Sequence, residues 1–339
     1  MAKEIRVGFY GTGGIASHTH IPILQDIAGV RVTAICDADA TILGEVGDTF
    51  AIAGEHRYSD GLEMVEKEDL DVLFSCVPAF VRTDVETTAA KKGVHIFSEK
   101  PQATELETAL RIDRAIRDAG VISTVGYRER HRPLFTEIKA FLAEKDVIHA
   151  QVIMPRPKSW PKAWLRNEDL SGGFLLEWGC HALDYTRYMT GLDVATVQSF
   201  TCRPDGSEES LSFSVNFQFE NGGTMHISFV NFLADGPVAK GRRDIPFFTY
   251  YYVGGQLDVF RAGGKEWSYE LSGEPVRSEL FDPWDAHDRV FMEAVRTGDR
   301  SEIRNDYADG LKTIGPLLAA GVSASDGGSP VSMAGFLKG

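Results

Sequence analysis

Lys100 is the residue whose place in the sequence points most directly to chemistry. It follows the apolar, strand-like run Val94-His95-Ile96-Phe97-Ser98-Glu99, and Pro101 comes directly after it and cannot continue a strand's hydrogen bonding. Strands that alternate with helices form parallel sheets, which bind ligands beyond the carboxyl ends of their strands. Lys100 is therefore the first candidate for a catalytic residue, and an exposed surface Glu-Lys pair is the alternative.

A second group of polar residues follows the turn Ser171-Gly172-Gly173. We expect one helix over residues 174–185, in which Glu177, His181 and Asp184 are spaced by four and then three and so share a face. Burying such groups beside leucines and a tryptophan is costly unless they are paired or used. Because histidine titrates near neutrality, His181 is suited to accept a hydroxyl proton, with Glu177 orienting it or stabilising its charged form. A satisfied structural role is the alternative for the histidine.

The residues before Lys100 indicate a nucleotide cofactor. Ile5–Tyr10 is a short strand-like run, and Gly11-Thr12-Gly13-Gly14-Ile15-Ala16 follows it and opens a helical pattern. Glycines in such a turn let the backbone approach a pyrophosphate, whose charge the amides at the helix start receive. The next strand ends at Asp37, about twenty residues further on, where an acid binds the ribose hydroxyls. Asp37 would repel the 2′-phosphate of NADP, so we expect NAD; a helix N-cap is the other role open to it.

Strand and helix patterns keep alternating to about residue 125. Helices are expected over 40–50, 61–67, 83–92 and 105–119, with strands over 71–78 and 121–125. The sequence therefore predicts an α/β Rossmann domain over residues 1–125. The residues expected to bind the cofactor are Gly11, Thr12, Gly13, Gly14, Ile15, Asp37, Val77, Pro78, Glu99, Lys100 and Pro101.

The remaining residues, 126–339, predict an α+β domain with a largely antiparallel open sheet. Apolar and neutral polar residues alternate over 211–219, and the turn Asn221-Gly222-Gly223 returns the chain into the next strand. The polar face of these strands carries no fixed charge, which predicts a homodimer or homotetramer formed through the sheet. That face comprises Ser212, Ser214, Asn216, Gln218, His226 and Ser228. Substrate contacts are expected from Trp164 and Arg166, in a loop rich in proline and tryptophan, and from Asp184.

Composition excludes several other classes of function. The 339-residue chain has a formal net charge of −14 and no basic patch, which argues against a nucleic-acid or anionic-membrane partner. It shows no apolar signal region and no apolar run of bilayer length, so we expect a cytoplasmic protein. The four cysteines lack metal or redox spacing and are expected as buried free thiols, and no convincing set of metal ligands is present.

The sequence resembles the oxidoreductase family that includes glucose-fructose oxidoreductase, inositol dehydrogenases and the rhizopine catabolism protein (Gfo/Idh/MocA). The resemblance rests on the glycine turn at 11–16, on Cys76-Val77-Pro78, on the Glu-Lys-Pro end of residues 93–101, and on the Gly-Gly turn before the acid-x-x-x-histidine helix. It implies hydride transfer between a nicotinamide cofactor and a secondary alcohol carbon of a sugar, inositol or related polyol. It also implies substrate contacts from Tyr127 and Arg128, in the crossover after the last Rossmann strand, with a plain charged linker as the alternative. Two residues depart from the family pattern: Arg82 stands where many members have histidine, and Glu177 where aspartate is common.

Two other functions stay open at this point. Family members can use transient oxidation with bound NAD to cleave or eliminate a glycosidic bond without net redox change. A dinucleotide-binding regulator without turnover is the third possibility, and the joint presence of Lys100, Glu177 and His181 argues against it.

Overall fold

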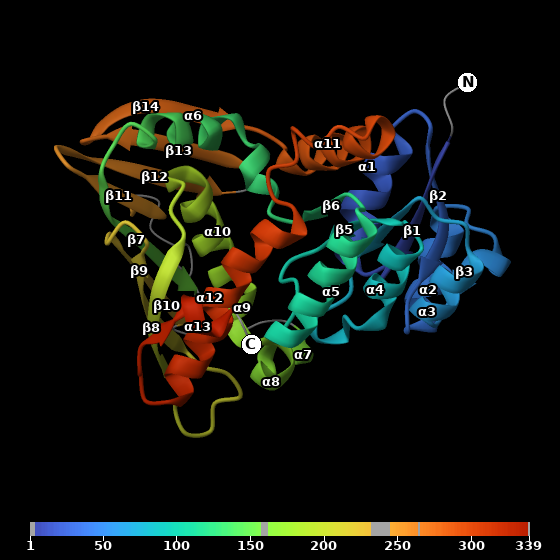
Figure 1. The fold of residues 1–339 in the computed structure, drawn as a ribbon, viewed down its shortest axis with the longest axis horizontal. Coiled ribbons are helices and arrows are strands. Elements are labelled where there is room, and N and C mark those ends of the chain that lie inside the picture. Colours follow the sequence, from blue (N-terminus) through green and yellow to red (C-terminus); the bar gives the residue numbers. More distant parts are fainter. Residues whose placement is uncertain (1–3, 157–161, 232–244, 264, 338–339) are drawn as a thin grey trace. The chain divides into compact units, whose positions relative to one another are not determined.

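The chain forms two compact units in the computed structural model, which describes residues 4–156, 162–231, 245–263 and 265–337 (Figure 1). Unit 1 comprises Met1–Arg128 and Pro283–Leu311, and unit 2 comprises Glu129–Asp282 and Lys312–Gly339. The expected boundary after residue 125 lies close to the end of the first segment of unit 1. Residues 283–311, however, belong to unit 1, whereas we expected them in the second domain.

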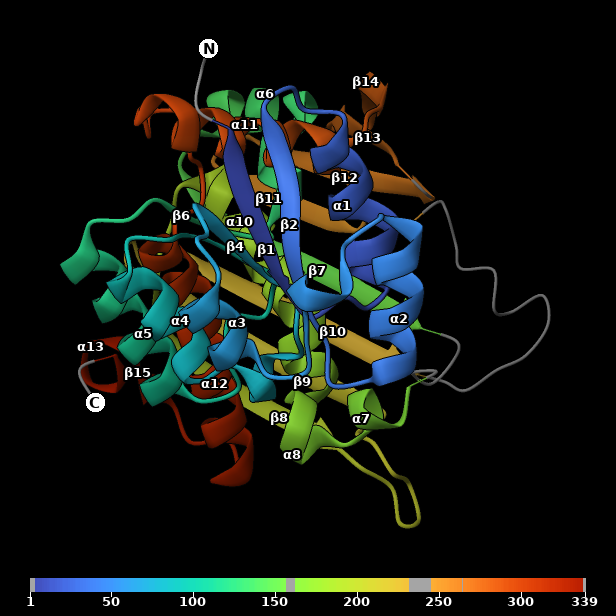
Figure 2. The same ribbon diagram turned by 90° about the vertical axis from the view of Figure 1, so that its right-hand side faces the viewer.

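Unit 1 is built on a six-stranded parallel sheet of order β3-β2-β1-β4-β5-β6 (Figure 2). Its strands are β1 (Ile5–Tyr10), β2 (Val30–Cys36), β3 (Arg57–Tyr58), β4 (Val72–Ser75), β5 (His95–Ser98) and β6 (Ser123–Val125). This doubly wound order, which reverses between β1 and β4, is that of the Rossmann fold and confirms the predicted class. Only β3 was not expected, because a strand of two residues leaves no periodic pattern in the sequence.

The helices of unit 1 lie close to their predicted positions. They are α1 (Ile21–Gln25), preceded by the π-helical segment η1 (Ala16–His20), then α2 (Ala40–Thr49), α3 (Gly61–Lys67), α4 (Asp84–Lys91), α5 (Leu106–Ala119) and, after the second unit's chain, α11 (Pro283–Thr297). Short 3-10 turns are η2 (Gly54–His56), η3 (Ala79–Val81) and η4 (Arg128–His131), the last of which runs past the end of the unit's first segment.

The core of unit 1 explains why α11 belongs to it. The rings of Phe74 in β4 and Phe97 in β5 stack with centroids 4.4 Å apart, and Phe291 of α11 meets Phe97 edge-on at 5.6 Å. Phe291 and Met292 are fully buried in the same apolar cluster as the strand residues. Burial of such side chains stabilises the fold by about 2 kcal/mol each, so α11 is held here by its apolar face.

Unit 2 contains a nine-stranded sheet of order β14-β13-β12-β11-β7-β10-β9-β8-β15. Only β7 and β10 pair in parallel and the remaining neighbours are antiparallel, which confirms the predicted α+β class with a largely antiparallel sheet. The strands are β7 (Val147–Arg156), β8 (Val194–Cys202), β9 (Ser212–Phe219), β10 (Thr224–Asn231), β11 (Phe248–Tyr252), β12 (Gly255–Gly263), β13 (Glu266–Leu271), β14 (Glu274–Leu280) and β15 (Val331–Ser332). The helices are α6 (Pro133–Leu142), α7 (Ala163–Arg166), α8 (Glu168–Ser171), α9 (Gly173–Glu177), α10 (Gly179–Thr190), α12 (Tyr307–Ser325), whose residues up to Leu311 belong to unit 1, and α13 (Met333–Phe336).

The alternation expected in β9 is present in the structure. Phe213, Val215 and Phe217 are buried, while Asn216 and Gln218 are exposed on the other face. The cysteines differ in part from expectation, because Cys36 and Cys180 are buried but Cys202 is exposed; all four are free thiols. Within the described residues, no helix combines the length and apolar character needed to cross a membrane.

Candidate functional site

The glycine turn after β1 lies at the point where the strand order of unit 1 reverses. Gly11 has a φ of 89°, and a Cβ atom there would lie 2.8 Å from the backbone nitrogen of Val77, just beyond β4. A Cβ at Gly13, by contrast, would have no atom within 4 Å. Gly11 is thus required by the close approach of two strand ends, and Gly13 leaves open space beside the helix start. Doubly wound folds bind dinucleotides at this place, where the strand order reverses.

Asp37 lies directly beside this turn at the carboxyl end of β2. Its Oδ2 accepts hydrogen bonds from the Thr12 backbone amide at 2.8 Å and the Thr12 hydroxyl at 3.1 Å. The N-cap of α2 is Asp39, whose side chain accepts from the amides of Thr41 and Ile42. The capping role left open for Asp37 is therefore filled by its neighbour, and a carboxylate beside the glycine turn fits the ribose hydroxyls of a dinucleotide.

Lys100 follows the end of β5 at the same edge of the sheet, because all six strands are parallel. The Glu99 amide donates to the Ser75 carbonyl at 2.9 Å and extends the pairing with β4 by one residue. Lys100 itself is half-buried, and its peptide bond to Pro101 is cis. Val77 and Pro78, at the end of the adjacent strand, are also half-buried. The structure thus brings the glycine turn, Asp37, Val77 and Lys100 to one edge of unit 1.

Arg82, the departure from the family pattern, is a buried tether in this region. Its guanidinium donates to the Ser98 hydroxyl at 2.5 Å and to the carbonyls of Val77 and Gln102, each at 3.3 Å. Only 2% of Arg82 is exposed. These contacts link the loop after β4 to the residues on both sides of Lys100.

In unit 2 the expected single helix over residues 174–185 is interrupted, so that expectation is wrong at Trp178. Helix α9 ends at Glu177 and α10 begins at Gly179, with Trp178 between them at a φ of −109°. Gly172, the N-cap of α9, and Gly173, its first residue, have φ values of 73° and 65°, which glycine adopts readily. Glu177 and His181 therefore stand on either side of a helix junction.

His181 is half-buried near the start of α10. The Tyr185 hydroxyl and His181 Nδ1 are 2.9 Å apart, and the Trp178 ring lies edge-on to the imidazole with centroids 6.0 Å apart. Tyr185 was not among the expected site residues, although its spacing of four residues from His181 on a helix was a usable signal. A hydroxyl at Nδ1 fixes the orientation of the imidazole.

Asp184 lies in a different environment from His181. It is fully buried, and both of its carboxylate oxygens accept from Arg130, at 2.6 and 2.9 Å. The Thr313 hydroxyl donates to it from α12 at 3.0 Å. This network fastens α10 inside unit 2, and the structure thus assigns the Asp184 carboxylate to internal partners.

The other residues expected to bind substrate are spread over both units. In unit 1 Tyr127 is fully buried, and the Arg128 guanidinium stacks on the Trp284 ring at 3.9 Å from its centroid. In unit 2 Trp164 is half-buried in α7, and Arg166 Nε pairs with Glu208 at 2.9 Å. Residues 157–161 of the loop before α7, including its first tryptophan, lie outside the described residues.

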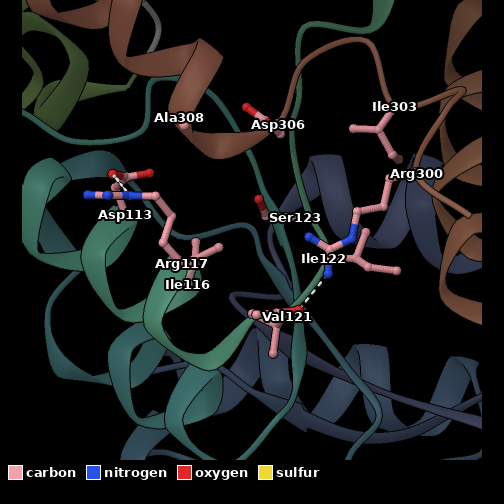
Figure 3. A pocket seen from close by; sticks show the side chains of 11 residues that line it. Asp113, Ile116, Arg117, Val121, Ile122, Ser123, Arg300, Ile303, Asp306 and Ala308 are labelled. Atoms are coloured by element: carbon pink, nitrogen blue, oxygen red, sulfur yellow. Dashed lines mark hydrogen bonds and ion pairs between the residues drawn. The ribbon is translucent and has the colours of Figure 1, made fainter. Parts of the chain in front are cut away.

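A cavity of about 230 Å³ in unit 1 is separate from the cofactor residues (Figure 3). It is lined by α5, by the residues entering β6 and by the segment 300–308, and none of the expected cofactor-binding residues contributes to it. Arg117 points to Asp113 across one wall, with Nε 2.8 Å from Oδ2. Across the part of the chain that the structure describes, no group of three or more His, Cys, Asp or Glu side chains is placed to hold a metal ion.

The strand order and the glycine turn at its switch point define a dinucleotide-binding protein of the Rossmann class. The model of the oxidoreductase family with an NAD-binding Rossmann fold (GFO/IDH/MocA) matches residues 5–127, and that of the GFO/IDH/MocA C-terminal domain matches residues 144–241. Together they cover more than half of the chain, which therefore belongs to the GFO/IDH/MocA oxidoreductase family. This confirms the resemblance carried by the glycine turn and the Glu-Lys-Pro element.

Individual relatives are distant. The oxidoreductase YrbE of Bacillus subtilis is 30% identical over 200 residues, which are 58% of this chain and 57% of that protein, so the chain spans little more than half the length of this relative. D-xylose 1-dehydrogenase (NADP(+)) 2 of Haloferax volcanii is 24% identical over 91% of this chain and 94% of its own length. The crystal structure of aldose-aldose oxidoreductase from Caulobacter crescentus complexed with glycerol superposes with a TM-score of 0.81 at 20% identity, covering 98% of this chain and 100% of that one. At this identity the structural match shows the shared fold.

Proposed function

We propose that this chain is an NAD-dependent oxidoreductase that transfers a hydride between NAD and a secondary alcohol carbon of a sugar, inositol or related polyol. The observation that carries the proposal is the position of Lys100, at the same sheet edge as the glycine turn and Asp37. An alcohol oxidation needs a hydride acceptor and a group that stabilises the oxygen as it loses its proton. Relatives named D-xylose 1-dehydrogenase and scyllo-inositol 2-dehydrogenase support the substrate class.

The residues of unit 1 fit a nicotinamide dinucleotide. The turn at 11–16 would receive the pyrophosphate, Asp37 the ribose hydroxyls, and the backbone at Val77-Pro78 the nicotinamide half. When bound, this cofactor supplies the hydride acceptor. Relatives are named for NADP(+) as well as for NAD(+), and the Asp37 carboxylate is our reason for preferring NAD, because it would repel a 2′-phosphate.

Within this proposal Lys100 and His181 divide the proton chemistry. His181, held at Nδ1 by Tyr185, accepts the hydroxyl proton, and Glu177 across the helix junction stabilises the charged imidazole. Lys100 donates a hydrogen bond to the reacting oxygen and relays the proton. Of the other expected substrate contacts, Trp164 and Arg166 remain our candidates in unit 2.

Substitution separates these two roles. His181→Ala should lower kcat by about a hundredfold or more while leaving NAD affinity nearly unchanged. Lys100→Met should lower kcat similarly and also weaken NAD binding, and Lys91→Met, at an exposed lysine of α4, is the matched control. A His181→Ala enzyme with normal kcat and only a raised KM would show that Lys100 is the base and His181 a substrate ligand.

A substrate screen tests the function itself. The purified chain is incubated with NAD and a panel of sugars and inositols, and the absorbance of reduced nicotinamide is followed. Net reduction with at least one polyol supports the proposal. Product without reduced cofactor would indicate transient oxidation with bond cleavage, and binding of NAD without any product would indicate a regulator.

We also propose that a second copy of the chain binds the open face of the unit 2 sheet. The exposed and half-buried side chains of β9 and β10 on this face are neutral, and Val230 is 41% exposed beside them. Light scattering at micromolar concentration should give a dimer or tetramer mass, and Ser214→Lys should lower it. A monomer mass for the unsubstituted chain would contradict this assembly.

A further inference from the structure

His20 is the most unusual buried polar residue of unit 1. It ends η1, the helical segment that begins just after the glycine turn, and it is fully buried. Its Nδ1 lies 2.8 Å from Oδ2 of Asp288 in α11, and its Nε2 lies 3.2 Å from Oε1 of Glu99. Aromatic rings enclose the imidazole, with the centroids of Phe97 at 4.9 Å and Trp284 at 5.5 Å.

The contacts of His20 favour its cationic form, although burial keeps the pKa of its partner Asp288 above the ordinary value. Ionised carboxylates only accept hydrogen bonds, so an imidazole placed between two of them must donate from both nitrogens. Burial alone would lower the pKa of His20, but the charges and hydrogen bonds of Asp288 and Glu99 outweigh it and raise the pKa to about 9. Burial also raises the pKa of Glu99, yet its hydrogen bond to His20 and the charge of His20 bring it below the ordinary value.

Glu99 connects His20 to Lys100, the proposed catalytic lysine. While Oε1 is held by His20, Oε2 accepts from the backbone amide of Lys100 at 3.0 Å. Gly126 leaves the room for this carboxylate, because a Cβ there would fall 2.6 Å from Oε1. Oε1 of Glu99 therefore contacts the buried His20, and Oε2 accepts from the amide of Lys100, the residue that we assign to the reacting oxygen.

We propose that His20 is a positioning residue that fixes Lys100 through the Glu99 carboxylate, with Asp288 as its anchor. The inference rests on the proposed function, in which Lys100 acts on the substrate oxygen. Because His20 stands in the helical segment that starts at the glycine turn, the same imidazole joins the cofactor turn to the lysine-bearing end of β5. An imidazolium is needed for this, since a neutral ring can donate to only one of the two carboxylates.

The first test compares substitutions that remove the cation or its anchor. His20→Gln keeps a donor but loses the charge, and Asp288→Asn keeps the shape of the anchor but loses its charge. Each should lower kcat by about tenfold or more with NAD affinity changed by less than about twofold, because a small displacement of a catalytic group is costly. Asp285→Asn is the matched control, since Asp285 lies one turn earlier on α11, is half-exposed and pairs with Arg289; it should leave kcat unchanged.

The second test measures the chemical reactivity of Lys100 and needs no catalytic turnover. Acylation of Lys100 by a small anhydride, measured by peptide mass spectrometry, should be slower in His20→Gln than in the unsubstituted protein. Loss of the buried cation favours the charged, unreactive ammonium of Lys100, whereas simple loosening of the structure would make acylation faster. Lys91 in the same digest provides the internal reference and should react equally in both proteins.

The outcomes separate this inference from the proposed function. A folded His20→Gln protein with unchanged kcat and an unchanged or faster acylation rate of Lys100 would overturn it. If His20→Gln does not fold, the same two readouts on Asp288→Asn decide. If the unsubstituted chain reduces no NAD with any polyol, the proposed function fails, and the acylation of Lys100 alone then supports or overturns the positioning role.

Discussion

Raising the pH through the range in which His20 releases its proton should destabilise unit 1. The native protein holds this proton with a pKa raised from 6.5 to about 9. At about 1.4 kcal/mol for each unit, the shift corresponds to about 3 kcal/mol of stability. His20 is fully buried, so solvent screening does not reduce this figure.

The raised pKa of His20 means that stability falls as the pH rises. Because the folded-state pKa lies above that of the unfolded chain, the contribution is fully present below pH 6.5 and is lost as the pH rises through about 9. The groups that face the imidazole are Asp288 from α11 and Glu99 after β5, and both hydrogen-bond to it. Burial raises the pKa of the nearby Cys76 thiol well above its ordinary value, so that thiol stays neutral in the folded protein.

Urea unfolding across this pH range measures the effect. The free energy of unfolding of the unsubstituted protein should fall by about 3 kcal/mol more than that of His20→Gln, which lacks the buried proton of the imidazole. Asp285→Asn should follow the unsubstituted protein throughout. Parallel pH curves for His20→Gln and the unsubstituted protein would refute the assignment of a buried imidazolium.

Three further substitutions address cofactor choice, the tether and the core of unit 2. Asp37→Ser should lower the ratio of kcat/KM for NAD to kcat/KM for NADP by about tenfold or more, which equals about 1.4 kcal/mol of discrimination. A higher kcat/KM for NADP than for NAD in the unsubstituted enzyme would contradict the NAD assignment. Arg82→Lys removes the fork that joins the Ser98 hydroxyl to the carbonyls of Val77 and Gln102. It should lower kcat on the order of tenfold with little change in NAD affinity, so an unchanged kcat would exclude a role for these contacts. Asp184→Asn leaves Arg130 buried without its charge partner and should lower the free energy of unfolding by about 3 kcal/mol, whereas a loss below about 1 kcal/mol would show that the pair is not essential.

Local patterns in the sequence were enough for most of unit 1. The bounds of α3 coincide with the expected ones, and the glycine turn and the Lys100 strand stand where their spacing placed them. These elements are specified by short-range features, namely apolar periodicity, a strand-ending acid and a proline stop. The same holds for β9, whose alternation distinguishes its two faces.

The features that could not be predicted depend on contacts between distant residues. Asp288 lies 268 residues from His20, and nothing in either segment reveals that they meet. The helix break at Trp178 was not expected, because a spacing of four residues is the same in a straight or an interrupted helix. Asp184 shared the expected face with His181, yet its ion pair with Arg130, 54 residues earlier, turns it into the interior of unit 2.

Transfer of deuterium tests the central claim most directly. A polyol found active in the screen is deuterated at the carbon that is oxidised, and the cofactor recovered after turnover is analysed by mass spectrometry. The proposed reaction predicts one deuterium in the reduced nicotinamide, formed at the normal rate by Lys91→Met and strongly slowed in Lys100→Met. Oxidised product without deuterium in the cofactor, or equal transfer by the Lys100→Met enzyme, would contradict the account.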